Sequence, residues 1–181
     1  IAHKVQKVIV PKYGLLSTPA TSHLIRKENA IGGIILSASH NPGGIDGDFG
    51  VKLNISNGGP APEIITNKIF KASQLLTSYK ICKIQLPDFS EYGTYPYDET
   101  TLEIIDGLTD YSNLMEKIFD FDQISDFLKK DFSLIFDAMN AVTGPYAKNI
   151  FVEKMGLAPD CVMNGNPLKD FGGLHPDPNL T

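Results

Sequence analysis

Cysteine is scarce in this chain, and no apolar run is long. Cys82 and Cys161 are its two cysteines, and neither has a His or Cys at ligand spacing, so the sequence predicts no zinc site and no disulfide framework. A membrane-spanning helix needs about 20 apolar residues in succession, and no run approaches that length. Residues 1–10 also lack the apolar core of a signal peptide. These absences predict a protein that spans no membrane and is cytoplasmic.

The chain also lacks a cluster of positive charge. It has 16 Lys and Arg against 21 Asp and Glu, a net charge of -5, and the basic residues are scattered along the sequence. Because proteins that bind nucleic acid gather Lys and Arg on one face, this pattern argues against nucleic acid as a partner. Nothing in the sequence indicates an oligomeric state.

Short apolar runs alternate with helical patterns, beginning near the amino terminus. Buried strands are predicted at residues 7–10 and 32–36. Between them we expect a helix capped by Thr18, with Pro19 in its first turn. The order strand, helix, strand predicts a right-handed parallel crossover. It places residues 37–41 at the carboxyl end of a parallel strand, where open α/β sheets bind ligands.

The remaining pattern predicts an α/β fold with a mixed, largely parallel sheet sandwiched by helices. We expect one nearly complete domain over residues 1–100 and the start of a second, similar domain over residues 101–181, with a loop or linker at 83–101. The other predicted elements are a strand at 51–55, a helix from Pro62 with a buried stripe (Ile64, Ile65, Ile69, Ala72, Leu75, Leu76), helices at 110–119, 122–130 and 144–155, and strands at 132–136 and 161–163. Asp122 is predicted to cap the helix at 122–130.

The segment Ser37-Ala38-Ser39-His40-Asn41 joins a buried strand to residue types suited to chemistry. A serine hydroxyl can act as a nucleophile, but its high pKa means that it needs a base or a bound phosphoryl group. Adjacent side chains on an extended backbone point apart, so a Ser39–His40 dyad is geometrically poor. The alternative is that Ser37, Ser39 and Asn41 only form an Asx or hydroxyl turn. These residues alone leave both interpretations open.

The wider sequence resembles a known family. Ser37–Pro42, then Gly43-Gly44, and the run Asn-Ile-Ser-Asn-Gly-Gly-Pro-Ala-Pro-Glu at 54–63 resemble the phosphoserine loop and following segment of phosphoglucomutases, in the α-D-phosphohexomutase superfamily. The 54–63 run points to the phosphoglucomutase branch and its parafusin-like relatives. Further similarity covers residues 14–20, 137–139, 142–146 and 171–179, so it extends over nearly the whole chain. One departure is Ser37, where the family more often has Thr.

The resemblance implies an isomerase of glucose metabolism with a phosphosugar substrate. Ser39 would carry the phosphoryl group, Mg²⁺ would bridge that phosphate, and glucose 1-phosphate and glucose 6-phosphate would interconvert through glucose 1,6-bisphosphate. His40 is implied to hold phosphate or sugar, and Lys52 to act as general base or phosphate anchor. Without the resemblance, His40 is equally a turn-stabilising residue, and a lysine on an edge strand is usually solvated.

Several acidic residues and a histidine are further candidates. Asp46 and Asp48 have a spacing that would suit magnesium. In the resembling family, however, the metal-binding aspartates lie in a separate loop, so we expect these two to be solvated turn residues. Asp137 is predicted either to support or cap local structure or to take part in catalysis. His175 and Asp177, flanked by prolines, are expected to be structural.

The sequence opens on Ile1 in place of Met and contains neither the family's Asp-x-Asp-x-Asp metal loop nor its sugar-recognition loop. We therefore expect an amino-terminal fragment that is inactive by itself. The alternative function is a non-catalytic, parafusin-like structural or regulatory phosphoprotein that keeps the loop as an interaction module. A serine hydrolase is excluded because no Gly-x-Ser-x-Gly turn is present.

Overall fold

The computed structural model describes residues 1–41, 44–130 and 132–175. Its elements alternate between strands and helices along most of the chain, which confirms the predicted α/β class with mixed sheets. In chain order the strands and α-helices are β1 (Lys7–Pro11), α1 (Thr18–Lys27), β2 (Gly32–Leu36), β3 (Val51–Ile55), α2 (Glu63–Gln74), β4 (Gly93–Tyr97), β5 (Thr100–Ile105), α3 (Gly107–Ile118), α4 (Phe121–Lys130), β6 (Phe136–Asp137), α5 (Gly144–Ala147) and β7 (Val162–Met163).

Strand β5 is the centre of a three-stranded sheet with the order β1-β5-β4. It pairs parallel with β1 and antiparallel with β4, and its Thr100, Leu102 and Ile104 are buried. The prediction of a loop or linker at 83–101 was therefore wrong for β4 and the start of β5. Tyr and Thr favour strands, and Pro96 is tolerated because β4 is an edge strand, where a missing backbone donor breaks no ladder bond.

Strands β2 and β3 form a second, antiparallel ladder. The predicted parallel crossover from β1 to β2 is not formed, because among the described residues β1 pairs only with β5. Helix α1 connects the two ladders, and its cap is Ser17, one residue before the predicted Thr18. The Ser17 hydroxyl accepts a hydrogen bond from the Ala20 amide at 3.3 Å.

Strand β2 is covered on one face only. A Cβ at Gly33 would lie 2.9 Å from the Ile25 side chain, so this face packs closely against α1. Alternate residues point the other way, and Ile34 and Leu36 are 69% and 62% exposed. The prediction that both are buried was wrong. The prediction of a buried stripe on α2 was also wrong, because no residue of α2 is buried. The apolar pattern was present, but no α-helix or strand of the described chain buries these faces.

The second half of the chain packs helices around a short parallel ladder of β6 and β7. Helix α3 begins earlier than predicted because Asp106 caps it by accepting from the Thr109 amide at 3.0 Å. Asp120, and not Asp122, accepts from the Gln123 amide at the start of α4. The predicted helix at 144–155 is α5 continued by a π-helix, Lys148–Lys154. The strand predicted at 132–136 is reduced to two residues, Phe136–Asp137.

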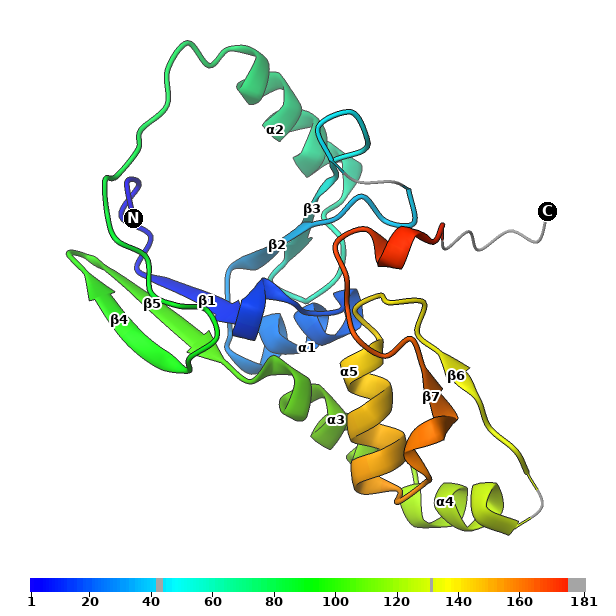
Figure 1. Cartoon of the computed structure of the whole chain (residues 1–181). Helices are drawn as coiled ribbons and strands as arrows, with labels where there is room; N and C mark the ends of the chain where they lie inside the picture. Colours follow the sequence, from blue (N-terminus) through cyan, green and yellow to red (C-terminus); the bar gives the residue numbers. More distant parts are fainter. Residues whose placement is uncertain (42–43, 131, 176–181) are drawn as a thin grey trace.

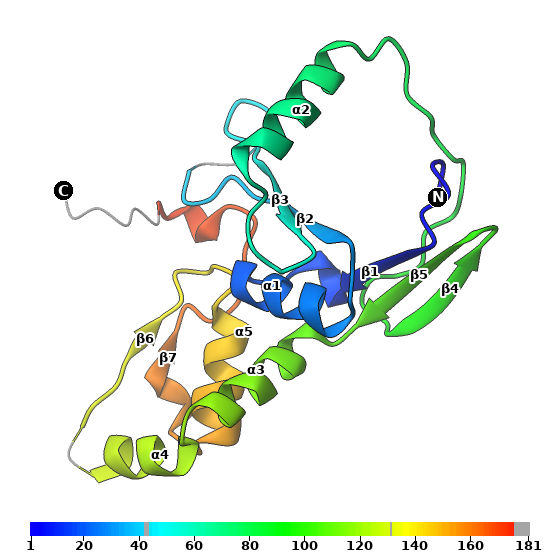
Figure 2. The ribbon, with the colours of Figure 1, turned by 180° about the vertical axis from the view of Figure 1, so that it is seen from behind.

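A tyrosine joins the two halves. The Tyr146 hydroxyl accepts a hydrogen bond from the Ser17 amide at 3.1 Å, and its ring meets Tyr111 of α3 edge to face at 5.6 Å between centroids. Burial raises the pKa of Tyr146 above its usual value. Helices α1, α3 and α5 therefore form a common core. Figures 1 and 2 show these three helices together at the middle of the molecule, with α2 apart from them.

The division into residues 1–100 and 101–181 stays a prediction. Its boundary falls at the start of β5, which pairs with both β1 and β4. Within the described residues, no helix is long and apolar enough to cross a membrane.

Candidate functional site

The loop after β2 is closed at its base by a backbone pair. The Ser37 amide donates to the Gly50 carbonyl at 3.0 Å, and the Gly50 amide donates to the Ser37 carbonyl at 3.1 Å. Farther out, the Asn41 side-chain amide donates to the Asp48 carboxylate at 2.6 Å. These bonds tie the two arms of the loop together, so the residues between them are held relative to the end of β2.

Ser39 has an unusual backbone conformation at the outer turn of this loop. Its φ is +61°, a left-handed value that non-glycine residues seldom adopt. The Ser39 amide donates to the Ser37 hydroxyl at 2.9 Å, which stabilises the turn. The Ser39 side chain is exposed. Non-glycine residues held in such conformations cluster at functional sites, so this geometry singles out Ser39 within the loop.

The turn also brings His40 back toward Ser39. The two sequence neighbours do not lie on an extended backbone, and the His40 Nδ1 is 3.4 Å from the Ser39 Oγ. The premise that their side chains point apart was therefore wrong, because the left-handed Ser39 reverses the chain direction. The distance is at the long end for a hydrogen bond. His40 can contact a group carried on Ser39, whereas a tight serine–histidine dyad is not formed.

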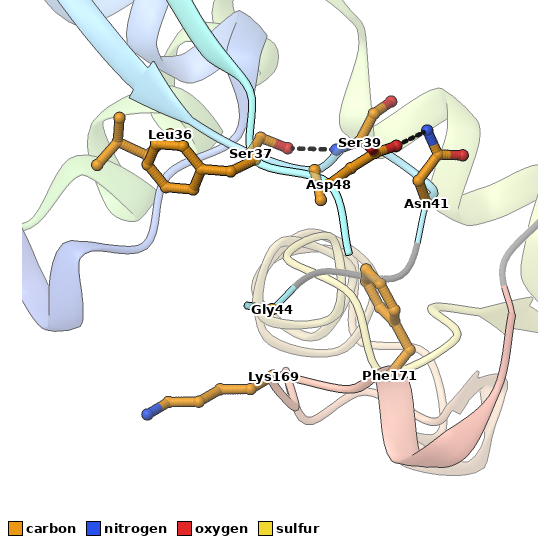
Figure 3. Close-up of a pocket in the computed structure, with 10 residues that line it drawn as sticks. Leu36, Ser37, Ser39, Asn41, Gly44, Asp48, Lys169 and Phe171 are labelled. Atoms are coloured by element: carbon orange, nitrogen blue, oxygen red, sulfur yellow. Dashed lines mark hydrogen bonds between the residues drawn. The ribbon is translucent and has the colours of Figure 1, made fainter. Parts of the chain in front are cut away.

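A pocket of about 240 Å³ lies beside Ser39. It is enclosed by the loop on one side and by a segment from the second half of the chain on the other (Figure 3). Its described lining consists of Leu36, Ser37, Ala38, Ser39, Asn41, Gly44, Asp48, Phe49, Lys169 and Phe171. The predicted Ser39 thus lies in the pocket. Lys169 carries no local sequence signal, and Phe171 carries only the family similarity of residues 171–179, because only the fold brings the two residues to the loop.

Asn140 holds that distant segment in place. The Leu168 amide donates to the Asn140 carbonyl at 2.8 Å, and the Asn140 side-chain amide donates to the Phe171 carbonyl at 3.3 Å. The Asn140 amide itself donates to the Asn164 carbonyl at 2.9 Å. One residue at the end of β6 therefore fixes both ends of the stretch that carries Lys169.

Asp137 has a supporting position in the same region. Its carboxylate accepts from the Met139 amide and from the Asn164 side chain, each at 2.9 Å. The Met139 hydrogen bond, followed by that of Asn164, holds the pKa of Asp137 below its usual value. Of the roles predicted for Asp137, this contact set supports local structure, since the carboxylate does not line the pocket.

Lys52 lies on β3, directly opposite Ile35. Opposed residues of an antiparallel pair share a face and successive residues alternate, so Lys52 lies on the opposite face from Leu36, which lines the pocket. Lys52 is exposed and is not among the described residues of the pocket lining. Its role at the site stays a prediction.

The other predicted candidates are spread over exposed positions. Asp46 is an exposed turn residue, whereas Asp48 lines the pocket and is bound by Asn41. His175 is exposed, and Asp177 lies outside the described residues. Among the residues that the structure describes, no three His, Cys, Asp or Glu side chains are grouped as metal ligands.

Comparisons with known proteins agree with this loop. Residues 1–80 match the family model described as phosphoglucomutase/phosphomannomutase, alpha/beta/alpha domain I. Over 181 residues the chain is 53% identical to a phosphoglucomutase of Emericella nidulans, covering 99% of this chain and 33% of that protein. Residues 1–80 belong to the phosphoglucomutase/phosphomannomutase family, and the chain as a whole resembles part of a phosphoglucomutase. The family predicted from the residues is confirmed.

Two further relatives extend the comparison. A chloroplastic phosphoglucomutase of Arabidopsis thaliana is 52% identical over 178 residues, covering 98% of this chain and 29% of that protein. The crystal structure of the exocytosis-sensitive phosphoprotein pp63/parafusin (phosphoglucomutase) from Paramecium, in its open form, aligns with a TM-score of 0.90 at 43% identity. The alignment covers 98% of this chain and 34% of the Paramecium chain. The chain spans about a third of the length of the curated relatives it matches.

The phosphoglucomutase/phosphomannomutase family that residues 1–80 match generally implies a metal cofactor. Of the described residues lining the pocket, only Asp48 supplies a carboxylate, whereas Mg²⁺ is held by several oxygen ligands. These residues do not form a metal centre by themselves.

Proposed function

We propose that this chain supplies the phosphoserine loop of a phosphoglucomutase that interconverts glucose 1-phosphate and glucose 6-phosphate. The observation that carries the proposal is the exposed, left-handed Ser39 beside the pocket, in a chain 53% identical to a phosphoglucomutase. The non-catalytic alternative is not favoured, because the relatives that match are named for this activity.

The reaction requires two phosphoryl transfers of opposite direction. First, the P–O bond to Ser39 Oγ breaks and a new P–O bond forms to the free sugar hydroxyl, whose proton passes to a base while Ser39 Oγ takes up a proton. The sugar then carries two phosphates. After it turns over, its other phosphoryl group returns to Ser39 Oγ, the serine proton passes to a base and the sugar oxygen that is released takes up a proton, so no phosphoryl group or proton is gained or lost. Phosphoryl transfer depends on positioning and charge neutralisation. The backbone hydrogen bonds that close the loop supply the positioning.

The roles of the other predicted residues follow from their places. His40 Nδ1 lies 3.4 Å from Ser39 Oγ and is proposed to contact the phosphoryl group. Lys52 is proposed as the base or a phosphate anchor on the family resemblance. Ser39, once phosphorylated, would hold Mg²⁺, which would neutralise charge on the phosphoryl group. A cytoplasmic location stays a prediction, since one relative is named as chloroplastic.

The test is phosphopeptide mass spectrometry on the protein purified from its source. Phosphate occupancy of Ser39 is measured before and after incubation with glucose 6-phosphate and Mg²⁺. We expect phosphate on Ser39 that exchanges with the sugar, and none on Ser56, an exposed serine in the turn after β3 that serves as the matched control. An unphosphorylated Ser39, or a phosphate that ignores the sugar, would refute the mutase function.

A further inference from the structure

The pocket beside Ser39 has an unbalanced set of charges for holding a phosphate. Asp48 contributes a carboxylate to the described lining, and Lys169 is the one Lys, Arg or His among those residues. A phosphate on Ser39 brings about 1.5 to 2 further negative charges at pH 7. The Asp48 carboxylate repels it, and a positive side chain in the same pocket would offset part of that repulsion.

We propose that Lys169 forms an anion-binding subsite for the phosphoryl group of Ser39, and that Asn140 is the positioning residue that keeps Lys169 in the pocket. This proposal rests on the proposed function, because it concerns the phosphorylated form of Ser39. Neither residue follows from the sequence motif, since both lie in the second half of the chain.

The placement of Lys169 supports this assignment. Lys169 and Phe171 lie across the pocket from Ser37 and Ser39, and the Lys169 side chain extends away from Ser39 (Figure 3). Lys169 is exposed, so its flexible four-carbon stem can reorient the ammonium group toward an anion without disturbing a packed core.

The segment that carries Lys169 is fixed from its base. Asn140 binds Leu168 on one side of Lys169 and Phe171 on the other. A Cβ at Gly172 would lie 2.8 Å from the Asn140 side-chain nitrogen, so the two are packed closely. Asn140 has a φ of +53°, a conformation that glycine adopts without strain. Asn140→Gly therefore removes the side-chain donor while leaving the backbone conformation accessible.

The test measures the second pKa of the phosphate on residue 39, which responds to nearby charges. Phosphoserine is incorporated at position 39 of the full chain during translation, and ³¹P NMR follows its second ionisation, whose pKa is ordinarily about 6. Lys169→Met should raise this pKa by about half a pH unit, because a nearby positive charge favours the doubly ionised phosphate. Lys169→Arg should retain the wild-type value. Lys68→Met, on the exposed α2, is the matched control and should change nothing.

Salt separates a charge effect from a structural one. Raising the NaCl concentration from about 0.02 M to about 0.5 M shortens the screening length, so the difference between wild type and Lys169→Met should shrink. Asn140→Gly should raise the pKa toward the Lys169→Met value. An unchanged value in Asn140→Gly would overturn the positioning role. If Lys169→Met titrates as Lys68→Met does, Lys169 is a solvated surface lysine and the subsite is refuted.

The outcome is independent of turnover, because translation, and not the sugar, places the phosphate on Ser39. A shifted pKa in a protein whose Ser39 never exchanges phosphate with glucose 6-phosphate would refute the mutase function and leave the subsite. If Ser39 exchanges phosphate with glucose 6-phosphate but Lys169→Met leaves the pKa of the phosphate unchanged, the subsite is refuted and the mutase function stands. Lys169→Gln gives a second neutral variant, which should match Lys169→Met.

Discussion

Gly50→Ala is predicted to loosen the phosphoserine loop without unfolding the protein. Gly50 and Ser37 exchange two backbone hydrogen bonds, of 3.0 and 3.1 Å, at the base of the loop. A Cβ on Gly50 would overlap the Ser37 carbonyl oxygen, which belongs to the backbone and cannot rotate away. The added methyl group therefore forces the pair apart.

The magnitude follows from the bonds that are lost. Each backbone hydrogen bond contributes about 0.5–1.5 kcal/mol net, so opening both removes about 1–3 kcal/mol from the local opening free energy. Since about 1.4 kcal/mol corresponds to a factor of ten, protection of the Ser37 and Gly50 amides from hydrogen exchange should fall by about 5- to 150-fold.

The assay is amide hydrogen exchange by NMR on the wild type and on two variants. Gly59→Ala is the matched control, because its Cβ would meet only the side chain of Asn57, at 3.1 Å. It should leave the protection of Ser37 unchanged. Unaltered protection of Ser37 in Gly50→Ala would show that the backbone pair does not hold the loop. A global loss of protection in Gly50→Ala would equally contradict a local effect.

Two further predictions concern the support of the site. Tyr146→Phe should lower the free energy of unfolding by about 1 kcal/mol, because the Ser17 amide loses its acceptor. Urea denaturation measures this change, and Tyr79→Phe, at an exposed tyrosine, is the control. The pKa of Asp137 is lower in the folded protein than its unfolded value of about 3.8. The contribution of Asp137 to stability is therefore fully present above that unfolded pKa. It is lost as the pH falls through the pKa of the folded state. Asp137→Asn should remove that part of the acid dependence, and a variant whose unfolding keeps the wild-type pH profile would contradict it.

The loop and its family could be predicted from the sequence because its signal is local. Consecutive residues from Ser37 to Pro42 carry the motif, and the strands at 32–36 and 51–55 were predicted with the bounds that the structure shows. Helix α2 also begins where Pro62 and Glu63 indicated. Short-range chemistry, such as proline in a first turn and alternation in a strand, is sufficient for these elements.

Other features depended on partners that a pattern does not name. The apolar residues of α2 predicted a buried stripe, but burial requires a second surface, and none of the described elements covers that face. Strand β4 was taken for a loop because its proline and tyrosines gain strand geometry only by pairing with β5. The caps of α1 and α4 were each misplaced, because several neighbouring side chains can accept the same amide.

The sequence by itself determined which residues carry the chemistry: a serine, a histidine and their turn lie within one short segment, and residues adjacent in the chain stay adjacent in any fold. The tertiary structure decided what faces them. Ser39 has a left-handed backbone within the loop that the Ser37–Gly50 and Asn41–Asp48 hydrogen bonds close. Lys169 reaches the pocket only because Asn140 and the packing of Tyr146 against α1 bring the two halves of the chain together. Contacts between residues so far apart in sequence arise from packing, and no local propensity encodes them.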